Sequence, residues 1–123
     1  MELLKKTDNI QPIELVCTAL GWDFQEDKDE NGHFVNISRK TRLGNEINID
    51  VCLSVEAEDD LEYAIKDAWE TMDVDYETYI WLDRYGNGKN GAPKHIKDVL
   101  ADVEHKKQLL GELWKAVENI LKM

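Results

Sequence analysis

The chain has 123 residues, of which 42% are hydrophobic and 33% are charged. This length and apolar content fit a single folded domain over 1–123 and exclude wholesale disorder. The 26 acidic and 15 basic side chains give a net charge of −11, which disfavours duplex nucleic acid and anionic membranes as general partners. The polar start carries no apolar segment, so we expect neither a signal peptide nor a membrane span, and a cytoplasmic location in a bacterial host cell.

The first part of the chain, about 1–55, is predicted to form a short helix followed by a sheet. Pro12 suits a first helical turn and Gly21 a helix end. The following segments alternate apolar and polar residues, which is the pattern of half-buried strands. We therefore expect a helix over 10–20, a β-hairpin of 22–26 and 34–41 with its turn at 29–32, and a third strand over 47–55.

The second part, about 56–123, is predicted to be helical. Apolar residues from Leu61 to Met72 recur at helical spacing, which predicts an amphipathic helix that covers the sheet. Asp75 can begin a short helix through Tyr85, and Pro93 can begin a last helix that runs nearly to the end. The predicted fold class is α+β, in the order α-β-β-β-α-α-α.

The last helix carries apolar residues in a seven-residue repeat. Ile96, Val103, Leu110 and Val117 define this repeat, but lysines 106 and 107 interrupt the positions between them. A continuous two-stranded coiled coil is therefore less favoured than packing on the chain's own sheet and helices. We expect part of this helix to remain available for a second subunit, so that the protein is a homo-oligomer.

No pattern of catalytic or metal-binding residues is present in the sequence. The histidines at 33, 95 and 105 share no helical face, and we expect them to be exposed. Cys17 and Cys52 are isolated, which is typical of buried thiols in a reducing compartment. Phosphate-loop, nucleophile-elbow and zinc-protease motifs are all missing. We expect no enzyme activity, no metal and no cofactor.

Most of the negative charge lies in one segment. Between Glu56 and Glu77 there are ten acidic residues against the single base Lys66. A solvated helix face explains such a segment. The alternative, less favoured, is a surface that imitates the phosphates of nucleic acid and binds a basic host protein. For that alternative the predicted partner surface consists of Asp59, Asp60, Glu62, Asp67 and Glu70.

Two basic clusters stand against this acidic background. One ends the second strand, and the other surrounds the glycine-rich loop 86–93. Glycines allow close backbone approach, and free N–H groups after Pro93 would hold a phosphate at the start of the last helix. An aromatic side chain near these bases could stack on a nucleobase. The candidate ligand-binding residues are Trp22, Arg39, Arg42, Trp81, Arg84, Lys89, Asn90 and Lys94.

Several segments between Asn36 and Val117 occur in a recognisable order. They are TRLGNEINIDV, an acidic amphipathic helix, DVDYETYIWLD, a glycine-rich loop that ends in Gly91-Ala92-Pro93, and IKDVLADVEHKKQLLGELW. In this order the chain resembles a family of small, mostly uncharacterised proteins of phages, prophages and other mobile elements of Firmicutes. The layout of a sheet followed by C-terminal helices also looks like that of Thoeris anti-defence nucleotide sponges.

This resemblance implies a role in counter-defence. The first hypothesis is a non-enzymatic phage protein that sequesters an anionic immune signal, a cyclic or ADP-ribose-type nucleotide. The alternatives are an acidic inhibitor of an anti-phage nuclease or other basic host protein, and an interaction module of a mobile element without a small ligand.

Overall fold

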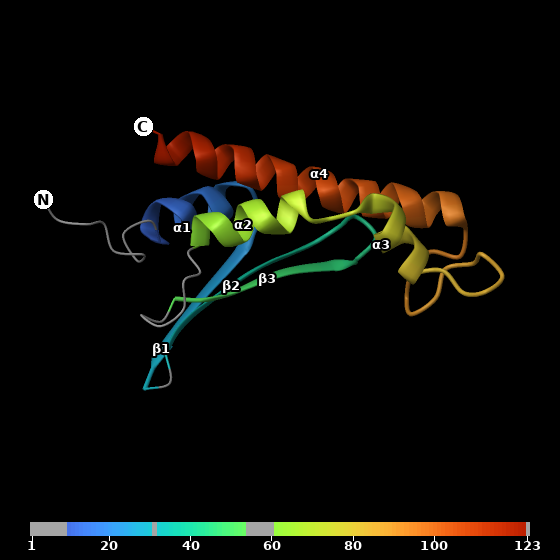
Figure 1. The fold of residues 1–123 in the computed structure, drawn as a ribbon, viewed down its shortest axis with the longest axis horizontal. Coiled ribbons are helices and arrows are strands. Elements are labelled where there is room, and N and C mark those ends of the chain that lie inside the picture. The colour runs from blue at the N-terminus through green and yellow to red at the C-terminus, as the bar shows by residue number, and fades with distance from the viewer. Residues whose placement is uncertain (1–9, 31, 54–60, 123) are drawn as a thin grey trace, which may run out of the picture.

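The computed structural model describes residues 10–30, 32–53 and 61–122. Its elements follow the predicted α+β order: a short N-terminal helix, a three-stranded antiparallel sheet, and helices that end in a long one (Figure 1). In chain order they are α1 (Ile10–Ala19), β1 (Asp23–Asp29), β2 (Gly32–Lys40), β3 (Glu46–Cys52), α2 (Leu61–Glu70), α3 (Val74–Ile80) and α4 (Ile96–Leu121).

The sheet is a simple meander with the strand order β1-β2-β3. Ile37 in the centre of β2 pairs with Phe24 on one side and with Ile49 on the other. Because neighbouring residues point to opposite faces of a strand, this register places Val35 and Ile37 on the same face as Ile47, Ile49 and Val51, whereas Phe34 lies on the other face and is exposed. The predicted single buried face is therefore confirmed for the part of the sheet that the structure describes.

The helices cover the apolar face of the sheet. α1 packs against β1, α2 packs against β3, and α4 contacts α1, α2 and α3 along its length (Figure 1). Leu61 and Ile65 of α2 and Leu113 of α4 are almost completely buried in one cluster with the strands. Burial of these side chains is the main force that holds the elements together, at about 1.5–3 kcal/mol per large apolar residue.

Lys106 and Lys107 of α4 have partners within the chain. The ammonium group of Lys107 donates to the backbone carbonyl of Trp69 and, over 2.8 Å, to that of Met72, at the C-terminal end of α2. A cation is favourable there because the last carbonyls carry the negative end of the helix dipole. Lys106 forms an ion pair with Glu77 of α3. The interruption of the heptad pattern thus reflects packing of α4 on its own helices, whereas the homo-oligomer stays a prediction.

Two predicted helix boundaries are wrong, the first residue of α4 and the last residue of α3. α4 begins at Ile96 rather than at Pro93, and α3 ends at Ile80 rather than continuing to Tyr85. The backbone between them forms contacts that a helix does not allow. Leu82 forms an antiparallel bridge with Gly88, and the Gly88 N–H donates to the Lys94 carbonyl over 2.9 Å.

The two cysteines differ in their surroundings. Cys17 lies in the core, where burial and the nearby carboxylate of Glu14 raise the pKa of its thiol to about 12. Cys52, at the end of β3, is only half-buried. The prediction of buried thiols is therefore confirmed for Cys17 alone. None of the helices in the described ranges is long and apolar enough to cross a membrane.

Candidate functional site

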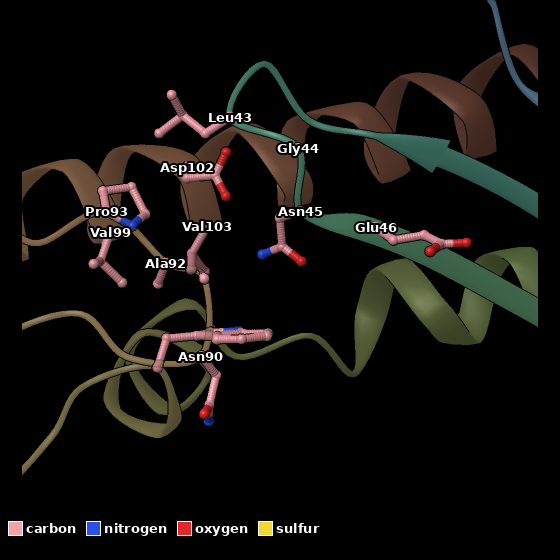
Figure 2. Close-up of a pocket in the computed structure, with 12 residues that line it drawn as sticks. Leu43, Gly44, Asn45, Glu46, Asn90, Ala92, Pro93, Val99, Asp102 and Val103 are labelled. Atoms are coloured by element: carbon pink, nitrogen blue, oxygen red, sulfur yellow. The ribbon is translucent and has the colours of Figure 1, made fainter.

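A small cavity lies where the β2–β3 turn, the end of α3, the glycine-rich loop and the first turns of α4 meet (Figure 2). Its volume is about 190 Å³. We call it the Asp102 pocket. Its walls are formed by Leu43–Glu46 of the turn, by Trp81, by Asn90–Pro93 of the loop, and by Val99, Asp102 and Val103 of α4.

Asp102 is the charged group in the wall contributed by α4. The residue is only 6% exposed, and its Oδ1 atom has no hydrogen-bond partner within the described part of the chain. The ion pairs found among the described residues do not include it. Burial of a polar atom without a partner is costly, so the Oδ1 atom is expected to meet a hydrogen-bond donor from outside the described residues.

Sequence reasoning did not select Asp102, although a signal was present. The residue lies three positions after Val99 and directly before Val103, and both valines are buried. A helix therefore places Asp102 beside its apolar stripe rather than on its solvent face. An acidic residue inside such a stripe is rare without a partner, and this mismatch could have identified it.

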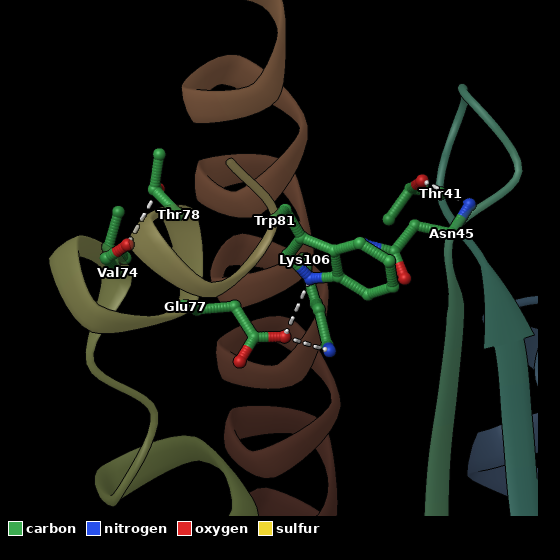
Figure 3. A network of polar contacts seen from close by, with 7 residues as sticks. All are labelled: Thr41, Asn45, Val74, Glu77, Thr78, Trp81 and Lys106. Carbon is green, nitrogen blue, oxygen red and sulfur yellow. Dashed lines mark hydrogen bonds and ion pairs between the residues drawn. The ribbon is translucent and has the colours of Figure 1, made fainter. Parts of the chain in front are cut away.

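Trp81 forms another wall and is held by a polar contact network. Its indole N–H lies 3.5 Å from the Glu77 Oε1 atom, which also accepts a hydrogen bond of 2.8 Å from Lys106 (Figure 3). Figure 3 shows the ring pointing from the end of α3 toward the turn that carries Thr41 and Asn45. The ion pair between α3 and α4 thus fixes the position of the aromatic wall.

The β2–β3 turn has a defined conformation. The Thr41 hydroxyl accepts from the Asn45 N–H over 3.1 Å, and the Thr41 N–H donates to the Asn45 carbonyl over 2.9 Å. Gly44 has φ +89°, a value that favours glycine. These contacts fix the Asn45 backbone, and Asn45 lines the same pocket as Asp102 (Figure 2).

The glycine-rich loop uses its backbone amides internally. The Asp83 carboxylate accepts from the N–H groups of Tyr85 and Asn87, and the Lys89 N–H donates to the Trp81 carbonyl. Gly88 approaches its own chain rather than a ligand, because a Cβ atom there would lie 1.7 Å from the Pro93 carbonyl oxygen. These loop amides are therefore used within the chain, whereas the predicted phosphate site at the N–H groups after Pro93 stays a prediction.

The predicted ligand residues divide into three groups. Trp81 and Asn90 line the Asp102 pocket. Arg42 lines an adjoining hollow of about 260 Å³ together with Asp98, Asp102 and His105. Arg84, Lys89 and Lys94 are exposed on the segment that borders the pocket without lining it. Lys94 precedes α4 and is not in its first turn, contrary to the sequence prediction.

Trp22 and Arg39 do not reach the pocket. Trp22 is 3% exposed and belongs to the core, which leaves no ring face for a ligand. The Arg39 guanidinium lies 5.9 Å from the centre of the Trp22 ring and donates to the Leu20 carbonyl just after α1. Trp22 therefore has a structural role, which corrects its selection as a ligand residue. Arg39 lines a separate hollow of about 430 Å³, and its role in ligand binding stays a prediction.

The histidines are not all exposed as predicted. His33 is 9% exposed, and its Nε2 atom forms a hydrogen bond with the side chain of Glu26 of β1. His105 is half-buried, and its Nδ1 atom has no hydrogen-bond partner among the described residues. His95 alone is exposed, just before α4. Across 10–30, 32–53 and 61–122, no group of three metal-ligating side chains lies close enough to hold an ion.

The acidic segment is only partly described. Asp59 and Asp60 lie outside the described residues, as do Glu56 and Glu58. On α2, Glu62 is half-buried, whereas Asp67 and Glu70 are exposed and Glu70 lies 3.9 Å from Lys66. Asp73 has a structural role, since its side chain caps α3. The acidic inhibitor of a basic host protein stays a prediction.

Near the Asp102 pocket, one segment carries more basic than acidic side chains, in contrast to the acidic segment 56–77. The segment 81–97 carries four basic side chains (Arg84, Lys89, Lys94 and Lys97) and one acidic side chain, Asp83. The loop side of the rim is thus locally basic in a chain of net charge −11, whereas the exposed Glu46 adds an acidic side chain on the side of the β2–β3 turn. An unpaired carboxylate inside and bases outside suit a ligand with a hydrogen-bond donor at one end and negative charge at the other.

No family model, no curated protein and no solved structure matches this chain.

Proposed function

We propose that this protein binds and sequesters a nucleotide without catalysis, with the heterocyclic base in the Asp102 pocket and the phosphate over the basic rim. The observation that carries the proposal is the buried Asp102 side chain, whose Oδ1 atom has no partner within the described residues, in a pocket with an aromatic wall. A base supplies the missing N–H donors and a flat face at the same time.

The size of the pocket supports a base rather than a whole nucleotide. An apolar cavity of about 150 Å³ accommodates benzene. The Asp102 pocket, at about 190 Å³, suits one heterocycle. The sugar and phosphate of the ligand would therefore lie outside the cavity, where the rim begins.

Trp81 gives the base a stacking surface. The Glu77–Lys106 ion pair already holds the indole in place, so little side-chain freedom is lost when a ligand binds. Stacking of a base on an aromatic side chain is worth about 1–3 kcal/mol in alanine substitutions.

The basic rim resolves the conflict between an anionic ligand and an acidic protein. Arg84, Lys89 and Lys94 are exposed on the segment next to the pocket, where they can meet a phosphate without being buried. Contacts of this kind are electrostatic and are weakened by salt. We therefore expect nucleotide affinity to fall as ionic strength rises.

The biological setting rests on the sequence resemblance. A binding protein of phage origin that holds a nucleotide without consuming it would act as a sponge for an immune signal. In an oligomeric sponge, several such pockets would be present in one particle. The apolar groove lined by Pro12, Leu15, Val16 and Ile120 is the surface we assign to subunit contacts, since Leu15 is 65% exposed there.

Isothermal titration calorimetry with nucleoside monophosphates and cyclic dinucleotides tests the proposal. We expect binding by the unmodified chain, a loss of affinity of at least tenfold in Trp81→Ala, and a smaller loss with reduced salt dependence in Arg84→Ala/Lys89→Ala. Lys115→Ala removes an exposed charge farther along α4 and serves as the matched control, with unchanged affinity. No binding at millimolar nucleotide, or equal losses in all variants, would contradict the proposed function.

A further inference from the structure

We infer that the Asp102 pocket selects a base with two adjacent N–H donors, the edge that guanine presents. This inference rests on the proposed function and adds the identity of the base. It follows from what the pocket wall offers, which is a carboxylate with an unused acceptor oxygen and a neighbouring carboxamide.

The carboxylate determines which base edges are compatible. An ionised aspartate only accepts hydrogen bonds, and two parallel N–H groups match its oxygens in a bidentate manner. Asp102 leaves Oδ1 unpartnered within the described chain, and its near-complete burial removes water as an easy substitute. A ligand edge with an acceptor opposite this oxygen would add repulsion in a site of low dielectric constant.

Among the common bases, guanine alone fits this requirement. Its N1–H and exocyclic amino group are adjacent donors. Adenine and cytosine each place an acceptor nitrogen beside their amino group, and uracil flanks its single N–H with two carbonyl oxygens. The pocket therefore favours a guanine nucleotide over an adenine-containing one, and a guanine cyclic nucleotide over an ADP-ribose derivative.

Asn45 can complete the recognition. Asn45 lines the same pocket as Asp102, and the hydrogen bonds of the β2–β3 turn fix its backbone (Figure 2). Guanine carries a carbonyl oxygen next to N1–H, and a carboxamide N–H can donate to that oxygen. Asp102 and Asn45 together would form hydrogen bonds with the amino group, the N1–H and the carbonyl oxygen on one edge of guanine.

Calorimetric titration with three nucleotides tests the inference. We compare guanosine, inosine and adenosine 5′-monophosphates, since inosine lacks only the exocyclic amino group of guanosine. We expect guanosine monophosphate to bind at least tenfold more tightly than the other two. Asp102→Asn, which keeps the shape of the side chain, should bring the guanosine and inosine affinities within threefold of each other.

Asp98→Asn is the matched control. Asp98 lies one helical turn before Asp102 and lines the adjoining hollow rather than the pocket, so its substitution should leave the preference for guanosine unchanged. Circular dichroism of each variant verifies that the fold is retained.

The outcomes separate this inference from the proposed function. Nucleotide binding without a preference for guanosine, or a preference that survives Asp102→Asn, overturns the inference and leaves the proposed function standing. Failure of all three nucleotides to bind overturns both. Binding of L-arginine in place of any nucleotide also overturns both, because the pocket would then take a cationic side chain of a protein partner.

Discussion

Glu77 of α3 and Lys106 of α4 form an ion pair of 2.8 Å, and the same carboxylate oxygen faces the indole N–H of Trp81. Both charged side chains are largely buried, with exposed fractions of 21% and 17%. The pair joins two helices and positions the aromatic wall of the Asp102 pocket. Glu77 is therefore a positioning residue rather than a ligand contact.

Substitution Glu77→Gln should weaken both the helix contact and the position of Trp81. We expect a loss of about 1 kcal/mol in the free energy of unfolding, since the pair is partly shielded from water. We also expect a several-fold loss of affinity for guanosine monophosphate and a changed chemical shift of the Trp81 indole proton. Urea denaturation, calorimetry and NMR measure these effects.

Glu70→Gln is the control for this change. It removes an exposed carboxylate 3.9 Å from Lys66 and should cost less than about 0.5 kcal/mol. A Glu77 variant that loses stability but keeps both the indole shift and the affinity would show that the ion pair does not position Trp81.

Asp102 should reduce the stability of the ligand-free protein. Removal of a buried charge without a partner relieves its desolvation cost, so Asp102→Asn should stabilise the fold by about 1 kcal/mol and raise Tm by about 4 °C. The same variant should lose its preference for guanosine. Thermal unfolding of both proteins without ligand measures this effect on stability. A lower Tm for Asp102→Asn would show that the Asp102 carboxylate has a hydrogen-bond partner within the fold.

Gly111 of α4 allows Trp69 of α2 to approach the helix backbone. A Cβ atom at Gly111 would lie 2.9 Å from the Trp69 indole nitrogen. At an exposed position inside a helix, alanine in place of glycine raises the free energy of unfolding by about 1 kcal/mol. Here we expect Gly111→Ala to destabilise by about 1–3 kcal/mol, because the indole must move.

A double variant identifies the cause of this effect. Combined with Trp69→Phe, which removes the clashing part of the ring, Gly111→Ala should cost clearly less than it does alone. Chemical denaturation of the four chains gives the coupling energy. Additive effects would contradict the clash as the cause.

Cys17 should make the fold sensitive to alkaline pH. Burial and Glu14 raise its thiol pKa from 9.0 to about 12, so the thiol ionises in the unfolded chain before it does in the folded one. Its contribution to stability is complete below pH 9 and is lost as the pH rises toward 12. We expect the unfolding free energy to fall between pH 8 and pH 10.5 by more in the natural chain than in Cys17→Ala. Equal slopes would contradict this assignment.

The apolar groove between α1 and the end of α4 should determine the oligomeric state. Leu15→Lys places a charge on a residue that is 65% exposed, so it should leave folding intact and dissociate a homo-oligomer that uses this groove. Native mass spectrometry of both chains reports subunit number. An oligomer that survives Leu15→Lys would place the subunit contact elsewhere.

Local patterns in the sequence predicted most of the fold. The alternation around Ile37 and Ile49 and the helical spacing of Leu61 and Ile65 give the sheet and α2 with their buried faces, because each element buries one side. The start of α4 was missed because the Lys94 carbonyl accepts from the Gly88 N–H, a contact within the loop that neither helical spacing nor the proline at 93 indicates.

The site was harder to predict, because residues far apart in the sequence form it. Trp81 and Asn90 were selected as an aromatic residue and a polar residue near basic side chains, and they do line one pocket. Trp22 fitted the same description, yet the core buries it. The place of Asp102 beside Val99 and Val103 was a signal in the sequence, whereas the pocket that it forms with the β2–β3 turn depends on the tertiary fold, which sequence spacing does not reveal.

An NMR titration of the ¹⁵N-labelled protein with guanosine 5′-monophosphate tests the central claim most directly. Four tryptophan indole signals report separate parts of the fold, and Trp81→Phe assigns the one in the pocket. We predict saturable shifts of the Trp81 indole and of the Asn45 and Asn90 side-chain amides, with the buried Trp22 signal unmoved. Shifts confined to other residues, or none at millimolar nucleotide, would contradict a base-binding Asp102 pocket.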